Sequence, residues 1–138
     1  MSPVHAGAEA IQRDCGTRSA ALTCLMTTPS GTFRMRARLI GQRSDPQAVI
    51  AAITDRSGVV HVWFIGRDLL EAGLGACASR PARRDRVWAW TSEEPAGRSL
   101  MVARASPSFE VLELDWTGVG AFLAEGRAEA RAAAAVRR

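Results

Sequence analysis

The clearest pattern in the chain is a strict alternation of apolar and basic residues over residues 32–39. Because successive side chains of a β-strand point to opposite faces of a sheet, this pattern predicts a half-buried strand. The arginines are expected on its solvated side, and a ligand-binding face is the alternative. The apolar positions are Phe33, Met35, Ala37 and Leu39, and the basic positions are Arg34, Arg36 and Arg38.

Apolar runs rich in β-branched and aromatic residues predict further strands, separated by turns that contain glycine and proline. The turn at 29–31 predicts that the run at 20–27 pairs antiparallel with the strand at 32–39. The turn at 55–58 predicts a second hairpin. The expected strands are 20–27, 48–53, 59–65, 86–91 and 100–105, with a possible further strand at 109–115.

Two segments have helical spacing instead. Residues 66–74 predict a short helix, which Asp68 is expected to cap or favour and Gly73 to close. From Trp116 to the C-terminus the pattern is again helical, whereas residues 75–84 are small and basic and predict a loop. The apolar positions behind these assignments are Leu69, Leu70 and Leu74, and then Val119, Phe122 and Leu123.

Together these elements predict one α+β domain, with mostly antiparallel sheets of six to seven strands, a short central helix and a C-terminal helix. The length of 138 residues suits a single domain. Residues 1–18 show no clear period and are expected to be a mobile lead-in, followed by the domain at 19–126. Residues 127–138 form an extension rich in alanine and arginine, helical by propensity but with little to bury.

The composition narrows the range of partners. All 18 basic residues are arginine and the formal net charge is +4; because arginine can stand at any solvated position, ordinary surface charge explains this better than nucleic-acid binding. No run approaches the roughly 18 apolar residues of a membrane span, and no signal-peptide pattern is visible at 1–16. We therefore expect a cytoplasmic protein with reduced thiols at Cys15, Cys24 and Cys77.

Catalytic patterns are missing from the sequence. His5 and His61 have no metal-ligand spacing with the cysteines, and no nucleophile elbow or phosphate-binding loop is present. Paired carboxylates occur only at Glu93 and Glu94, in a turn where solvation explains them. We expect no catalytic residue, no metal, no cofactor and no enzymatic activity.

One segment has the chemistry of a single-stranded nucleic-acid contact. Arg83, Arg84 and Arg86 could follow phosphates while Trp88 and Trp90 stack on bases. The alternative is that both tryptophans are core residues and the arginines a solvated loop. The alternative is favoured, because two large aromatic side chains on one face usually seek burial.

Several stretches, in order, resemble the SsgA-like proteins, a family of sporulation and cell-division proteins of morphologically complex actinobacteria. The most specific is residues 62–74, a tryptophan-bearing strand that runs into an RDLLxxGL helix; weaker matches are a DPxAV stretch at 45–49, RVW at 86–88, SP at 106–107 and FL at 122–123. The motif residues, expected to be mainly structural, are Asp45, Pro46, Trp63, Arg67, Asp68, Leu69, Leu70, Gly73, Leu74 and Trp88.

The resemblance implies a non-enzymatic protein that acts at the septum during sporulation-specific division. One family member helps to place the tubulin-like division protein FtsZ, and others act on septation and spore-wall maturation. The resemblance also implies a fold similar to the plant whirly single-strand-binding proteins, with two antiparallel sheets, and a homo-oligomer, expected to be a trimer. A septal adaptor that binds division proteins is the first hypothesis; a single-stranded nucleic-acid-binding protein is the alternative.

Overall fold

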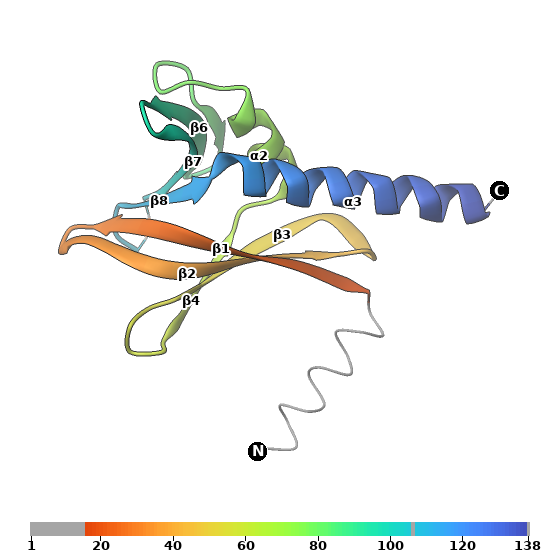
Figure 1. The fold of residues 1–138 in the computed structure, drawn as a ribbon, viewed down its shortest axis with the longest axis horizontal. Coiled ribbons are helices and arrows are strands. Elements are labelled where there is room, and N and C mark those ends of the chain that lie inside the picture. Colours follow the sequence, from red (N-terminus) through yellow and green to blue (C-terminus); the bar gives the residue numbers. More distant parts are fainter. Residues whose placement is uncertain (1–15, 106, 138) are drawn as a thin grey trace.

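The computed structural model describes residues 16–105 and 107–137 (Figure 1). Within these residues four strands are followed by a short helix, and four more strands are followed by a long helix. They are β1 (Thr17–Thr28), β2 (Gly31–Gln42), β3 (Asp45–Thr54), β4 (Val60–Phe64), α2 (Arg67–Leu74), β5 (Ala82–Arg84), β6 (Val87–Glu94), β7 (Gly97–Arg104), β8 (Glu110–Asp115) and α3 (Trp116–Arg137).

The strands form one antiparallel sheet of eight strands, in the order β4-β3-β2-β1-β8-β7-β6-β5. Strands β1–β4 are one meander and β5–β8 are another, and α2 connects them along the chain. The two meanders join where β1 pairs with β8, from Cys24 opposite Leu114 to Thr27 opposite Val111. In Figure 1 the sheet curls, so that the two meanders lie as separate layers to either side of α3.

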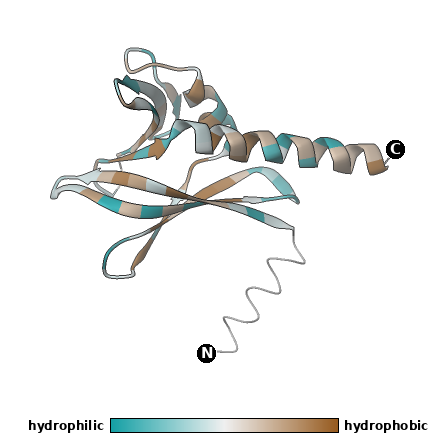
Figure 2. Cartoon of the chain, viewed as in Figure 1, coloured by the Kyte–Doolittle hydropathy of each residue, from teal (hydrophilic) through white to brown (hydrophobic). Residues whose placement is uncertain are grey.

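The hydrophobic core lies between the inner face of the curled sheet and the two helices. Alternate residues of the strands contribute to it, as the brown and teal bands along β2 show in Figure 2. Helix α3 packs Val119, Phe122 and Leu123 onto this face, and α2 adds Leu69 and Leu70. The strand residues in the core include Leu39, Ala51, Ile53, Trp63, Ala89, Leu100, Val102, Leu112 and Leu114.

The second half of α3 leaves the domain. Gly126 is the last buried residue that the structure describes in this helix; from Arg127 to Val136 only Glu129 is partly covered. Figure 1 shows the helix projecting beyond the sheet toward the C-terminus. The predicted helical character of this segment is confirmed, and it has little to bury, as its composition indicated.

The α+β class, both predicted hairpins and the strand at 109–115 are confirmed. The predicted number of strands is wrong, because the segment expected as a loop at 75–84 contains β5, which pairs with β6 across a turn at Asp85. The eight strands also form one sheet and not two. Strand β1 begins at Thr17; the rest of the expected lead-in, with its possible short helix, lies outside the described residues, apart from Gly16.

Candidate functional site

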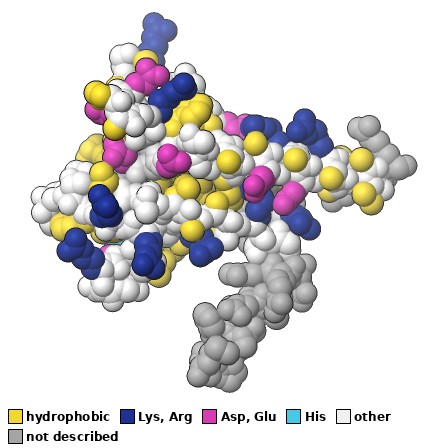
Figure 3. All heavy atoms as spheres, in the orientation of Figure 1, with side chains coloured by type: hydrophobic (Ala, Val, Ile, Leu, Met, Phe, Trp, Pro, Cys, Tyr) yellow, Lys and Arg dark blue, Asp and Glu magenta, His cyan; other side chains and the backbone are white. Residues whose placement is uncertain are grey.

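The sheet face that points away from the core, here called the outer face of β1–β4, has an unusual distribution of charge. Its β2 residues include Arg34, Arg36 and Arg38, all exposed, as the alternation predicted. This arginine column forms no ion pair with any described residue, and Arg38 donates only to the hydroxyl of Ser19, at 3.0 Å. In Figure 3 basic side chains gather over this part of the sheet.

A second column, on edge strand β4, is apolar and exposed. The exposed fractions are 53% for Val60, 42% for Val62 and 79% for Phe64. The register places Val62 opposite Ala52 of β3, which in turn lies opposite Arg38. The β4 column and the arginine column therefore run side by side, two strands apart, on the same face.

The two columns meet a hollow at one end of the outer face. It has a volume of about 520 Å³. Its apolar wall contains Ile40, Ile50 and Phe64, one cross-strand row of the sheet. Asp45, Asp85 and Arg84 are the charged residues of its lining. A large apolar side chain of a partner could be buried in this hollow, next to its charged residues.

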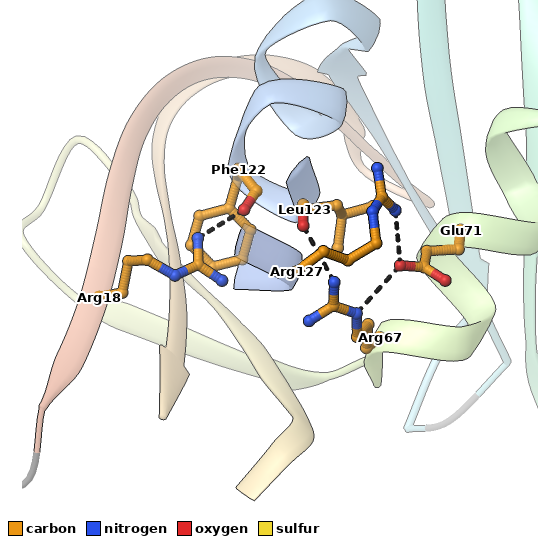
Figure 4. A network of polar contacts seen from close by, with 6 residues as sticks. All are labelled: Arg18, Arg67, Glu71, Phe122, Leu123 and Arg127. Carbon is orange, nitrogen blue, oxygen red and sulfur yellow. Dashed lines mark hydrogen bonds and ion pairs between the residues drawn. The ribbon is translucent and has the colours of Figure 1, made fainter. Parts of the chain in front are cut away.

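The RDLLxxGL block has its main role inside the fold. Arg67 is only 7% exposed; its Nη2 donates to the Leu123 carbonyl at 3.0 Å and its Nε to Glu71 at 2.9 Å. Arg127 donates to the same Glu71 oxygen, also at 2.9 Å (Figure 4). Burial alone would raise the pKa of Glu71, but the bonds from the two arginines outweigh it and lower that pKa. Arg67 therefore ties α2 to α3.

Arg18, which no sequence pattern distinguishes, holds α3 from the other side (Figure 4). Its guanidinium lies 4.0 Å from the centroid of the Phe122 ring and donates to the Phe122 carbonyl. Burial, the largest effect, and the nearby Arg67 lower the pKa of Arg18, and Glu129 opposes them. No local signal could have found this contact, because its two partners are 104 residues apart.

Two glycines allow these close approaches. A Cβ at Gly73 would lie 2.6 Å from the Ala89 Cβ, so this glycine lets α2 lie directly on β6. The prediction that Gly73 ends the helix is wrong, since α2 continues to Leu74 and Gly75 follows as its C-cap. Gly126 leaves room for Arg18 and Arg67, whose guanidinium nitrogens would lie within 3.0 Å of a Cβ there.

The other motif residues lie at different depths in the fold. Asp68 lies in the first turn of α2, but the N-cap is Gly66 and no side chain caps the helix, so the predicted cap is wrong. With its NH₂ group turned toward the carboxylate, Gln47 donates to Asp68 at 2.8 Å. Asp45 and Pro46 are exposed at the start of β3. Trp63, Leu69 and Leu70 are in the core, with Leu74 packed against it.

The candidate nucleic-acid segment is divided between an edge strand and a turn. Arg83, Arg84 and Arg86 are exposed, whereas Trp88 and Trp90 are half-buried on the face of β6 opposite Ala89. The prediction that both tryptophans are core residues is wrong, because α2 covers only the Ala89 side of the strand. The tryptophans line a hollow of about 260 Å³ with Phe109, Ala103, Pro81 and Ala78.

His61 and Asp55 interact in the turn between β3 and β4. His61 Nε2 is 3.0 Å from Asp55 Oδ2, and the same carboxylate accepts from the amides of Ser57 and Val59, which fixes the β3–β4 turn. Among the described residues there is no group of three metal-ligating side chains and no helix long and apolar enough to cross a membrane. The contact between His61 and Asp55 therefore stabilises a turn.

Solved structures similar to this chain identify its fold. One is a structure of SsgB, whose mutations correlate to longitudinal cell division during sporulation of Streptomyces coelicolor; it superposes with a TM-score of 0.72 and 25% sequence identity, over 82% of this chain and 87% of that chain. The predicted resemblance to the SsgA-like proteins is thus confirmed by a shared fold. No family model matches the sequence, and no curated protein matches it.

A second structure has the same fold. It is an SsgA-like sporulation-specific cell division protein from Thermobifida fusca, with a TM-score of 0.70 and 20% identity over 80% of this chain and 79% of that chain. The sequence block that most resembles the SsgA-like proteins holds α2 in place: Arg67 ties it to α3 and Gly73 lets it lie on β6. The exposed outer face of β1–β4 is therefore the better candidate for contact with another molecule.

Proposed function

We propose that the chain acts in sporulation-specific cell division, as a protein that binds division proteins at the septum and not as an enzyme. The observation that carries this proposal is the fold shared with SsgB over most of both chains, at 25% identity. A match over nearly the whole domain argues for a common role more strongly than a shared motif does, although one fold can host several functions.

A role as septal adaptor is supported by the surface chemistry. The exposed apolar β4 column beside the arginine column is unusual for a solvated sheet, because contiguous exposed apolar surface commonly marks an interaction site. Under this proposal the partner is a septal division protein, with FtsZ or another SsgA-like protein as the first candidates. Control of septum and spore-wall maturation is the related possibility that the family resemblance implies.

The first test is the position of the protein in its own host. A fluorescent fusion, expressed from the native position during spore formation, is expected to form a ladder of bands at future septa. A strain lacking the chain provides the baseline for septum number and spacing. Diffuse signal throughout sporulation, with unchanged septa in the deletion strain, would contradict the proposal.

Assembly provides an independent test. The sheet is open, with β4 and β5 as its two edges, and exposed sheet edges tend to be paired or covered. A homo-oligomer is therefore part of the proposal, with a trimer as the family expectation. Light scattering at tens of micromolar protein is expected to give a trimeric mass, and a monomeric mass would refute the expectation.

Binding of single-stranded nucleic acid is the second candidate. It rests on Trp88 and Trp90, which are half-buried beside a hollow where a base could stack. Arg83 already lies over Trp88, 5.3 Å from the ring centroid, and its Nε donates to the Asp85 carbonyl. A base would have to replace this contact, which makes the candidate weaker. A steep, log-linear loss of oligonucleotide binding with added salt would favour it.

A further inference from the structure

We infer that the outer face of β1–β4 binds an acidic amphipathic helix of a partner protein, with the acidic side of that helix on the arginine column and its apolar side on the β4 column. This inference rests on the proposed role as a protein-binding factor and adds the chemistry and the shape of the partner. It concerns a surface that includes none of the residues of the RDLLxxGL block.

Charge selects the partner. The outer-face positions of β1, β2 and β4, and those of β3 at 48–54, include three exposed arginines and no aspartate or glutamate; the carboxylate of this face, Asp45, lies at the far end of β3, opposite Gln42. Cations at this spacing, about 7 Å apart along one side of a strand, would meet acidic side chains of a partner. Because exposed ion pairs alone contribute little, the apolar β4 column has to supply most of the affinity, and the arginines the choice of partner.

The distance between the columns indicates a helix. The arginine column on β2 and the β4 column are two strands apart, which is roughly 10 Å for strands spaced about 4.8 Å. That is the diameter of an α-helix with its side chains, roughly 10–12 Å. Between the columns, Ala52 and Thr54 of β3 are small and partly covered, so a helix can approach the sheet closely while its two flanks reach the columns.

The free edge of β4 is a less suitable place for a partner. The Val62 carbonyl accepts from Arg104 Nη1 at 3.3 Å, and Arg104 is itself held by Glu110 at 2.9 Å and stacked over Trp63. An added strand would have to displace this arginine. A partner that lies on the face leaves the contact intact.

The carboxylates at the two ends of the outer face argue against a membrane as the partner. Asp45 and Asp85 lie beside Phe64 at one end of the outer face, and Asp55 lies in the turn at the other. Arg84 lines the same hollow, so the lining carries one net negative charge, which opposes an anionic lipid surface that receives Phe64. A helix can place its acidic side chains on the arginine column and none beside the hollow.

A designed peptide tests the chemistry directly. The probe is a fluorescein-labelled helix of about 18 residues, roughly five turns, with glutamate along one flank and leucine along the next. Its control has lysine in place of every glutamate. Fluorescence anisotropy with the full chain is expected to show binding of the acidic peptide and at least about tenfold weaker binding of the lysine peptide. Equal binding of the two peptides, or none, overturns the inference.

Variants locate the site. Arg36→Glu and Val62→Asp are each expected to weaken binding of the acidic peptide about tenfold, roughly the effect of one lost anchor or one reversed charge. The matched control is Arg131→Glu, an exposed arginine on the projecting part of α3, which is expected to leave binding unchanged. Circular dichroism confirms that all three variants fold. Equal affinity of wild type and Arg36→Glu would overturn the assignment to this face.

A crosslinking experiment in sporulating cells tests the inference on the native partner. A photo-reactive amino acid replaces Val62, with Ala132 on α3 as the control position. Crosslinking to an acidic, apolar segment of another protein supports the inference; crosslinking to lipid, to nucleic acid or to a second copy of this chain overturns it. Septal bands without peptide binding would refute only the helix partner, whereas peptide binding without septal bands would refute only the septal role.

Discussion

Replacing Gly73 by alanine is expected to destabilise the fold, although alanine favours helices. The new Cβ would lie 2.6 Å from the Ala89 Cβ and 3.1 Å from Leu100 Cδ1. Ala89 is fully buried in a strand with neighbours on both sides, so it cannot move away cheaply. Overpacking of this kind costs about 1–3 kcal/mol, against a gain of about 1 kcal/mol from helix propensity.

The expected net loss is therefore up to about 2 kcal/mol, which lowers the melting temperature by up to roughly 8 °C for a chain of this size. Thermal unfolding followed by circular dichroism measures it. The matched control is Gly120→Ala in α3, where a Cβ would meet nothing within 4 Å. There the same substitution is expected to raise the free energy of unfolding by about 0.5–1 kcal/mol.

A double mutant tests the cause of the loss. Ala89→Gly removes the atom that the new Cβ at position 73 would strike. Combined with Gly73→Ala, it is expected to recover about 1 kcal/mol relative to the sum of the two single changes, because residues in contact are not additive. Stabilisation by Gly73→Ala equal to that by Gly120→Ala would refute the reasoning, and so would strict additivity in the cycle.

Three further outcomes follow from the polar contacts. Arg67→Met removes a buried guanidinium and is expected to lower the free energy of unfolding by about 2–3 kcal/mol, whereas the exposed Arg127→Met costs about 0.5 kcal/mol or less; equal urea midpoints for the two variants would contradict this. Burial raises the pKa of Cys24 to about 11, and a hydrogen bond from Ser79 lowers that of the exposed Cys77. At pH 8, iodoacetamide should therefore label Cys77 before Cys24, as followed by mass spectrometry, because the thiolate is the nucleophile; labelling of both at the same rate would refute the burial of Cys24. Hydrogen bonding by His61 lowers the pKa of Asp55, so its contribution to stability is present above the ordinary aspartate pKa and is lost as the pH falls through the folded value. Asp55→Asn should flatten the acid side of the stability profile, and an unchanged profile would count against the turn contact.

Much of the fold could be predicted because its strands are long and one-sided. The alternation in β2 predicts which side chains lie on each face of the sheet, and the glycine-containing turns predict the hairpins. Strand β5 could not be found this way, because three residues, two of them arginine, carry no period. Its pairing with β6 depends on the turn, where Asp85 adopts a left-handed conformation with φ of 54°, which aspartate tolerates better than most residues.

Of the candidate site, the arginine column could be predicted from the sequence and the apolar β4 column could not. The exposure of the arginine column follows from its period, but the run at 59–65 is almost uniformly apolar, so nothing in it separates Val62, which is exposed, from Trp63, which is buried. That difference depends on what covers each face of the sheet. The burial of Arg67 has the same origin, since its acceptor on Leu123 is 56 residues away.

The order of the strands has a consequence for how the chain folds as it is made. Each meander needs only neighbouring strands, but β1 must wait for β8, whose residues lie about 90 positions later in the sequence. Until then β1 is an open edge on a four-stranded intermediate, and α3, which covers its inner face, has not yet been synthesised. Closure of this long loop is the step with the greatest entropy cost. Folding is thus expected to finish from the middle of the sheet, after the last strand and helix have left the ribosome.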